Sequence, residues 1–429
     1  MTGKGRTCRV VSGAAIFLLP VLVVLAVLLA ACAGRPLTEK KVAMDDRLAS
    51  SGMRVVAYYP SWTAHGSTPY EVADIPAHLL THVNYAFANV GAKSGQIALG
   101  QPDLDTDRLF PGDPQGVGAF GGHFRQLLLL KERYPHLKTL ISVGGWTWSG
   151  NFPTAAETAA SRQRFARSCA AFASRYGFDG VDIDWEYPAS DGLQPGRPED
   201  RRNFTLLLAA LRQELDAQSA RDGREYQLTI AAPGGLAKID ALEVEEIHPY
   251  LDFINIMAYD FAGTWSPVTS FNAPLYGTSD PLQPGDDLSR HAHADAAVER
   301  FLTAGVPPDK LVLGLPFSGK SWSGVPEVNE GLFQPFDGGA REVRTSWRAL
   351  RANQLYGMQR FWHEEAKVPW LYDADRGIMV SYEDPESARL KAAYARDRGL
   401  GGVMFWQITA DDEDHSLLEA LVSGLSGQH

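Results

Sequence analysis

Short apolar runs alternate with longer helical patterns along most of the chain. Eight of the runs have the length and apolar content of buried strands. They cover residues 54–58, 81–86, 138–143, 180–184, 227–231, 253–257, 311–315 and 402–405. Between them, segments such as 155–175, 200–217 and 288–304 carry apolar residues every three or four positions, as amphipathic helices that cover a sheet do.

This alternation predicts parallel strands joined by crossover helices. Eight strand–helix units close a (β/α)8 barrel, so the predicted fold class is α/β, a TIM barrel. The spacing is even except between the seventh and eighth runs, where residues 316–401 are too many for one helix. We therefore expect a small α+β insertion domain at 317–380, between strands 7 and 8. Residues 53–316 and 381–425 would form the barrel.

The first residues bear on the compartment. A basic stretch precedes an apolar run from Val10 to Leu29 and then small residues, the layout of a secretory signal. Leu29-Ala30-Ala31-Cys32 resembles the bacterial lipobox, in which the cysteine is lipidated. We expect a signal peptide at 1–31, a lipid on Cys32, a tether at 32–52 and a protein anchored to the membrane at the cell envelope, facing outside the cytoplasm. The alternatives are an uncleaved membrane anchor, or an ordinary signal peptide with secretion.

Composition narrows the class of partner. The 429-residue chain is 45% apolar and 21% charged, which is ordinary for a globular protein with a substantial core. Its net charge of −11 argues against nucleic acid as a partner. Of the three cysteines, Cys8 lies in the signal, Cys32 is the lipidation candidate and Cys169 stands in a helical pattern. No intramolecular disulfide framework is expected.

Three acidic residues share one face of the fourth predicted strand. Because strand side chains alternate, Asp182, Asp184 and Glu186 point one way, toward the barrel axis. They lie at the C-terminal end of the strand, where barrel active sites are found. Neighbours two positions apart are about 6–7 Å apart along a strand, so their charges interact. One pKa should rise, and Glu186, the outermost and longest, is the natural proton donor.

Two other interpretations fit an acidic run of this kind, a solvent-exposed strand face and a magnesium or calcium site. Gly180, Trp185 and the terminal position in a barrel strand favour catalysis. A glycosidase that uses double displacement needs a second carboxylate on the opposite side of the sugar, whereas these acids share one face. We expect no protein nucleophile, no metal and no cofactor. The 2-acetamido group of the sugar would serve as nucleophile, oriented by Asp184.

The acidic run resembles the signature D-x-x-D-x-D-x-E of glycoside hydrolase family 18, matched by Asp179, Asp182, Asp184 and Glu186. The third run ends in a match to the family's S-x-G-G motif, and the sixth in a match to M-x-Y-D-F. The resemblance covers nearly all of the chain after residue 54 and implies a chitinase. It also identifies the 317–380 segment with the family's chitinase insertion domain, which walls a deep groove.

The resemblance implies roles for individual residues. Ser142 would bond the buried carboxylate pair, Tyr259 would hold the acetamido oxygen, and Asp260 would assist at the cleavage site. Asp179 would be a supporting member of the signature. The substrate-binding positions that it implies are Tyr58, Phe87, Gly145, Trp146, Met257 and Trp406, with Trp406 as the floor under the reacting sugar.

Tryptophan placement favours a carbohydrate groove independently of the resemblance. Aromatic rings at a wet barrel mouth offer flat apolar faces that suit stacking on sugars. Seven of the ten tryptophans are expected at or just past strand ends: Trp62, Trp146, Trp148, Trp185, Trp265, Trp322 and Trp406. For Trp185 we favour core packing.

The chain departs from the family pattern after the seventh and eighth runs. Ser318 and Lys320 stand where relatives usually carry Tyr and Arg, and lysine cannot reproduce the bidentate contacts of arginine. Gln407 follows Trp406 where many relatives carry Glu. We therefore expect altered substrate contacts on that side.

The expected function is endo-acting, retaining hydrolysis of β-1,4-linked N-acetylglucosamine polymers, chitin or chito-oligosaccharides, by a monomer. An endo-β-N-acetylglucosaminidase and a peptidoglycan-directed hydrolase of the same family are alternatives. A non-catalytic carbohydrate-binding protein is the third, and the retained Glu186 argues against it.

Overall fold

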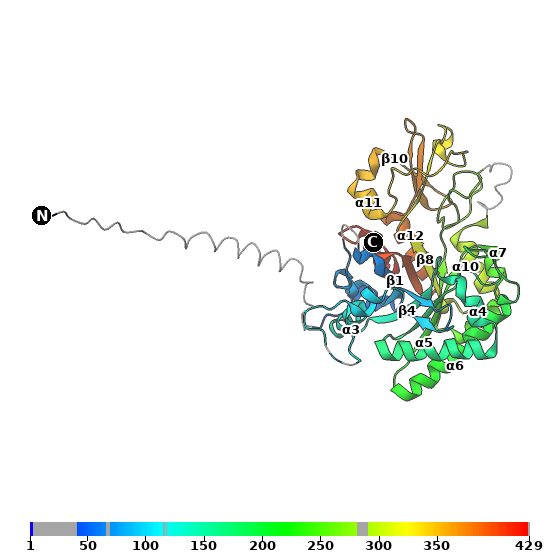
Figure 1. Ribbon diagram of the computed structural model, residues 1–429. Coiled ribbons are helices and arrows are strands. Elements are labelled where there is room, and N and C mark those ends of the chain that lie inside the picture. The colour runs from blue at the N-terminus through cyan, green and yellow to red at the C-terminus, as the bar shows by residue number, and fades with distance from the viewer. Residues whose placement is uncertain (3–40, 66–68, 115, 117, 281–290, 428–429) are drawn as a thin grey trace.

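A closed ring of eight parallel strands forms the body of the protein (Figure 1). The computed structural model describes residues 1–2, 41–65, 69–114, 116, 118–280 and 291–427. Residues 3–31 of the predicted signal peptide, Cys32, residues 33–40 of the predicted tether and the predicted helix start at 288 lie outside the described residues. The barrel strands are β1 (Arg54–Pro60), β2 (His82–Val90), β4 (Lys138–Gly144), β5 (Gly180–Asp184), β6 (Gln227–Pro233), β7 (Phe253–Met257), β8 (Leu311–Pro316) and β13 (Gly402–Trp406).

The order β1-β13-β8-β7-β6-β5-β4-β2 closes because β2 pairs back to β1, with Val56 opposite His82. The TIM-barrel prediction is confirmed, and each predicted run coincides with a barrel strand. One short strand, β3 (Ile97–Ala98), extends the end of β2 in antiparallel fashion.

Helices follow the strands on the outside of the ring (Figure 1). The predicted 155–175 helix is two helices, because Thr158 caps a new one with a hydrogen bond to Ser161 N. The 200–217 helix continues to Asp222 and ends at Gly223, which adopts the left-handed φ of +68°. The helices are α2 (Asp46–Ser51), α3 (Gly122–Arg133), α4 (Phe152–Ala156), α5 (Ala159–Tyr176), α6 (Asp200–Asp222), α7 (Leu236–Asp240), α8 (Val244–Ile247), α10 (Ala294–Thr303), α11 (Trp347–Ala352), α12 (Pro385–Asp397) and α13 (Ser416–Ser426).

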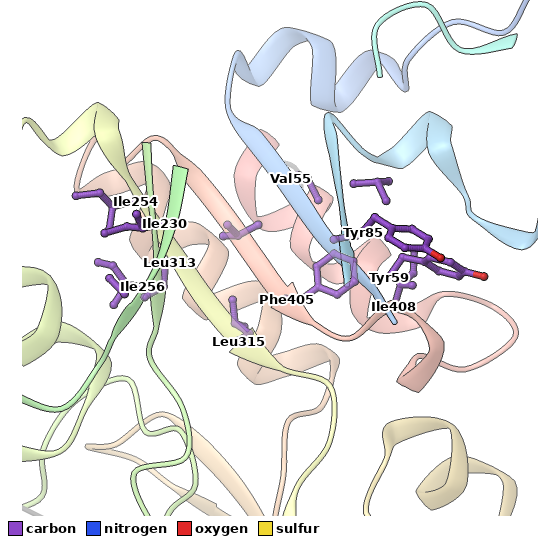
Figure 2. Close-up of a cluster of buried hydrophobic side chains, with 14 of the residues drawn as sticks. Val55, Tyr59, Tyr85, Ile230, Ile254, Ile256, Leu313, Leu315, Phe405 and Ile408 are labelled. Carbon is purple, nitrogen blue, oxygen red and sulfur yellow. The ribbon is translucent and has the colours of Figure 1, made fainter. Parts of the chain in front are cut away.

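Strand alternation separates two apolar layers. On β1, Val55 and Tyr59 point outward into the layer beneath the helices, whereas Val56 and Tyr58 point into the barrel. Figure 2 shows part of the outer layer, where side chains from β1, β2, β6, β7, β8 and β13 gather. The inner layer contains Phe253 and Met404, so the barrel is a packed core and not an open pore.

Between β8 and β13 the chain forms a second, antiparallel sheet beside the barrel (Figure 1). Its order is β10-β11-β12-β9, and it has its own buried cluster, which includes the fully buried Trp322. These strands are β9 (Lys320–Ser323), β10 (Gln359–His363), β11 (Val368–Asp373) and β12 (Ile378–Ser381). Just after β12, the buried Glu383 forms an ion pair with the buried Lys391 of α12.

The described N-terminal segment packs at the end of the barrel where the strands begin. Val42 N donates to the carbonyl of Arg133, at the C-terminal end of α3. Arg47 pairs with Glu419 of α13 at 2.7 Å. Among the described helices, none has both the length and the apolarity needed to cross a bilayer.

Candidate active site

β5 carries the acidic run into the barrel, and its first acid is enclosed by donors. Asp182 is fully buried. Its carboxylate accepts hydrogen bonds from Ser142 Oγ at 2.7 Å, Tyr58 OH at 2.8 Å and Thr229 Oγ1 at 2.6 Å. Asn255 Nδ2 is 3.4 Å away. Burial raises the pKa of Asp182, and these hydrogen bonds oppose the rise.

The second acid stands next to Asp182 and has fewer contacts. Asp184 ends β5 and is buried, and its Oδ1 has no hydrogen-bond partner within the described chain. Burial raises its pKa well above the ordinary value, and the charges of Glu186 and Asp182 raise it further. A carboxyl in this position holds a proton readily, because three acids in a row cannot all ionise in a confined space.

The third acid, Glu186, lies two residues beyond the end of β5, half-buried at the wall of a cavity. Burial raises the pKa of Glu186 to about 7. Asp260 adds to the rise, whereas Tyr187 and Lys238 lower this pKa. A pKa near neutrality lets one carboxyl donate a proton and later accept one, as general acid–base catalysis requires.

The wall across from β5 comes from the residues after β7. Burial raises the pKa of Tyr259 well above its ordinary value, so its hydroxyl stays protonated and can donate. Asp260 follows with a φ of +58°, and its N–H donates to Asn272 Oδ1 at 3.2 Å. Its carboxylate binds Lys320 Nζ at 2.7 Å. Lys320, a departure from the family pattern, thus places a cation in the cavity beside Asp260.

Aromatic rings form the floor. Phe87 stacks on Trp406 with ring centres 5.7 Å apart, and Tyr58 lies 5.8 Å from Trp406. Gly145 has no side chain because a Cβ there would lie 2.6 Å from the Phe87 ring. Trp146 and Trp265 are about half exposed or more at the rim, and such rings present flat apolar faces to a ligand.

The cavity at the C-terminal ends of the strands has a volume of about 800 Å³. Most of the residues that the sequence predicts for the site line it. These are Tyr58, Phe87, Trp146, Asp184, Glu186, Met257, Tyr259, Asp260 and Trp406. Ser142 and Asp182 lie beneath its floor inside the barrel. No three His, Cys, Asp or Glu side chains of the described chain are arranged to hold a metal ion.

Asp179 lies away from this cavity, just before β5 begins. Its carboxylate binds Lys131 at 2.8 Å and the backbone N–H of Thr139 at 2.9 Å. Arg224 is also near, at 3.5 Å. Asp179 therefore ties the start of β5 to β4 and α3.

The tryptophan prediction is wrong in part. Trp62, Trp146, Trp265 and Trp406 line the cavity. Trp322 is fully buried in the second sheet, because the inward face of β9 needs an apolar side chain. Trp185 stacks on Phe152 in the outer layer, as expected for a core residue.

Among the cavity residues that the sequence analysis missed, two lie next to the proton donor. Lys238, on the short helix α7, places its ammonium 3.8 Å from the centre of the Tyr187 ring. Both side chains line the cavity next to Glu186. The position of Tyr187, directly after Glu186, was a usable signal. Lys238 gave none, because it stands 52 residues downstream in a short helix without any motif.

Of the other departures from the family pattern, Ser318 accepts a hydrogen bond from Asn272 through its backbone carbonyl, and Gln407 accepts one from the Thr409 hydroxyl.

Comparison with known proteins agrees with this geometry. A sequence model described as glycosyl hydrolases family 18 matches residues 54–411. Chitinase A1 of Niallia circulans is 41% identical over 403 residues, which cover 85% of this chain and 57% of that protein. Among solved structures, chitinase ChiA74 from Bacillus thuringiensis superposes with a TM-score of 0.81 at 36% identity, covering 88% of this chain and 70% of the other.

A second solved structure, a family 18 N-acetylglucosaminidase from Paenibacillus barengoltzii, superposes with a TM-score of 0.72 at 36% identity. The match covers 87% of this chain and 99% of the other. A family match over most of the chain, a closed barrel and the acid run at its mouth agree with one another. The chain belongs to the glycosyl hydrolases family 18 and is a glycoside hydrolase.

Proposed function

We propose that the protein cleaves β-1,4-linked N-acetylglucosamine polymers, chitin or chito-oligosaccharides, internally and with retention of configuration. Glu186 is the general acid and base. The observation that carries the proposal is the pairing of Glu186, with a pKa near 7, and the buried Asp184, whose Oδ1 has no partner in the described chain. A buried acceptor at the cavity wall suits a donor brought by the substrate, and the N–H of a 2-acetamido group is such a donor.

The arrangement of carboxylates favours the acetamido group as nucleophile. Among the described residues that line the cavity, the carboxylates are Asp184, Glu186 and Asp260. The first two come from one side, and Asp260 is engaged by Lys320. A glycosidase that uses its own nucleophile needs a free carboxylate opposite the acid, about 5–5.5 Å from it.

In the proposed first step, the acetamido oxygen attacks the anomeric carbon while Glu186 gives its proton to the glycosidic oxygen. The C–O bond breaks and leaves a cyclic oxazolinium ion. Asp184 accepts the acetamido N–H, and Tyr259 donates its hydroxyl to the same group. In the second step Glu186 takes a proton from water, which attacks the anomeric carbon from the face that the leaving group vacated. The ring opens and the original configuration returns.

The test is the product profile from chitohexaose, with anomeric form followed by NMR. The wild type should release dimers and trimers, first as the β anomer. Glu186→Gln should bind the hexamer yet lose activity by about 10²–10⁴-fold. Glu199→Gln, the same substitution at an exposed glutamate, should leave the profile unchanged. Undiminished turnover by Glu186→Gln would contradict the assignment of the acid.

A second candidate function comes from the likeness to the Paenibacillus N-acetylglucosaminidase. The same digestion separates the two functions, because that activity would release monomers from one end of the hexamer. Chitosan of low acetylation tests the nucleophile. Cleavage at deacetylated residues as fast as at acetylated residues would refute substrate assistance.

We also propose that residues 317–380 form the chitinase insertion domain, and that the protein is a monomer anchored at the cell envelope by a lipid on Cys32. The second sheet beside the cavity supports the first of these, since Lys320 at the start of β9 lines the cavity. Cys32→Ser should move the protein from the membrane fraction to the soluble fraction.

A further inference from the structure

A buried hydroxyl lies directly behind the proton donor. Ser149 follows β4, at the start of a 3-10 turn (Ser149–Asn151), and is 4% exposed. Its Oγ accepts a hydrogen bond from the backbone N–H of Glu186 at 2.8 Å and donates to the carbonyl of Gly145 at 2.9 Å. The carbonyl of Asp184 is also within reach, at 3.2 Å. One side chain therefore joins the two loops that build the site.

The sheet itself cannot fix Glu186. The last rung between β4 and β5 pairs Gly144 with Asp184, so Glu186 lies beyond the ladder. Its N–H finds its partner in Ser149. On the carbonyl side, Gly192 packs so closely that a Cβ there would lie 2.4 Å from Glu186 O. The backbone of Glu186 is thus held from both sides.

Ser149 is in turn held by its own segment. Phe152, three residues on, is fully buried and stacks on Trp185 with ring centres 5.3 Å apart. Asn151 Nδ2 donates to the carbonyl of Val90 at 2.8 Å. The segment 149–152 therefore contacts the chain at Trp185 and Glu186. Phe152 packs on Trp185, and Ser149 provides the hydrogen bond to Glu186.

We propose that Ser149 is a positioning residue for acid catalysis, whose hydroxyl fixes the backbone of Glu186 so that its carboxyl meets the glycosidic oxygen. Ser149 is absent from the lining of the cavity, so it acts through Glu186 and not on the substrate. Catalysis is sensitive to placement because a shift of about 1 Å in a reacting group costs roughly 10²-fold in rate. The inference rests on the proposed role of Glu186 as the acid.

The test compares two substrates that differ in their need for a proton. The leaving group of chitotetraose is a sugar, which departs as a poor alkoxide unless the acid protonates it. The leaving group of 4-nitrophenyl chitobioside is 4-nitrophenolate, which departs without a proton. Ser149→Ala should lower kcat for chitotetraose by about 10- to 100-fold with an unchanged KM. It should lower kcat for the nitrophenyl glycoside much less. Ser149→Thr, which keeps the hydroxyl, should restore kcat.

Thr81→Val is the matched control. The Thr81 hydroxyl also accepts a backbone N–H and donates to a carbonyl, both of Val55, but at the opposite end of the barrel. This variant should lose thermal stability and keep kcat on both substrates. Should Ser149→Ala not fold, Ser149→Cys takes its place, because a thiol fills the space and is a weaker hydrogen-bond partner.

An unchanged kcat in Ser149→Ala, or equal losses on both substrates, overturns the inference. Glu186→Gln, measured on the same pair, keeps this failure separate from that of the proposed function. If Glu186→Gln loses more kcat on chitotetraose than on the nitrophenyl glycoside and Ser149→Ala does not, Glu186 remains the acid and the positioning role of Ser149 is wrong. If Glu186→Gln shows no selective loss, the acid assignment itself is wrong.

Discussion

The positive charge of Lys238 affects the pKa of the proton donor, Glu186. Lys238 lowers the pKa of Glu186, against the larger effect of burial, which raises it to about 7. Because the acid works only when protonated, activity should decline as the pH rises through about 7. The groups around Glu186 thereby set the alkaline limit of the enzyme.

Replacing Lys238 should move that limit. Lys238→Met removes the cation and leaves the stem of the side chain, so the pKa of Glu186 should rise. The alkaline limb of kcat/KM against pH, which reports ionisation of the free enzyme, should then shift to higher pH, measured on chitotetraose from pH 5 to 9. Lys238→Arg keeps the charge and should reproduce the wild-type limb. A shift to lower pH would show that burial changes outweigh the charge.

At this scale the sequence predicts residues that stand in one strand or one motif, such as Asp182, Asp184 and Glu186. It does not predict residues that the fold brings from elsewhere. Lys238 comes from the helix α7 and Ser149 from the turn after β4, and the sequence pattern assigns a role to neither. Only the closed barrel brings them together.

At the scale of elements, the site depends on how closely β4 and β5 approach. Gly144 has a φ of +108°, and a Cβ there would lie 2.3 Å from the carbonyl oxygen of Asp184 and 2.6 Å from the Phe152 ring. The strand ends can meet only because position 144 has no side chain.

Gly144→Ala should therefore lower both stability and activity. The added methyl pushes Asp184 away, and overpacking of this kind costs about 1–3 kcal/mol of unfolding free energy. Gly223→Ala is the control, because Gly223 also has a positive φ but nothing within 4 Å of its Cβ position. It should lose stability and keep kcat. Urea unfolding and kcat on chitotetraose distinguish the two.

The buried pair at the end of the second sheet offers a separate test. Lys391 binds Glu383 and the carbonyl of Ala273, and both side chains of the pair are buried. Lys391→Met would leave the buried carboxylate of Glu383 without its cation and should lower the free energy of unfolding, measured in urea, by about 3–5 kcal/mol. Lys391→Met combined with Glu383→Gln should recover part of that loss. No recovery in the double variant would mean that the lysine acts through Ala273 alone.

Element prediction succeeds where a period is strong and fails at the boundaries. All eight barrel strands follow from apolar runs, because a strand buried on both faces is apolar throughout. The break between α4 and α5 depends on one capping hydrogen bond at Thr158, which apolar spacing does not register. Trp322 was predicted at the barrel mouth, but it lies in the second sheet. Its position there depends on the pairing of β9 with β12, a contact between residues distant in sequence that the local pattern does not reveal.

On the scale of the whole molecule, the proton donor reduces stability at alkaline pH. Folded Glu186 keeps its proton to about pH 7, whereas an unfolded glutamic acid loses it near the ordinary value of 4.5. Between these values the unfolded chain binds fewer protons, so this residue's contribution to stability falls as the pH rises.

Glu186→Gln should therefore melt at a higher temperature than the wild type at pH 8. The difference should close at pH 4, where Glu186 is protonated in both states. Calorimetry at the two pH values measures it, with Glu199→Gln as a control that should show no such gap. A Tm at pH 8 equal to that of the wild type would mean that Glu186 is better solvated than its burial indicates.

The position of the described N-terminal segment has a consequence for how the enzyme meets its substrate. Val42 is bound to the C-terminal end of α3, where the barrel strands begin, and the cavity opens at the other end of the same strands. With a lipid on Cys32, the end of the barrel where the strands begin would face the bilayer, and the cavity would face away from it. Polymer chains would then approach from the surrounding medium, and the membrane surface would not compete for the rim tryptophans.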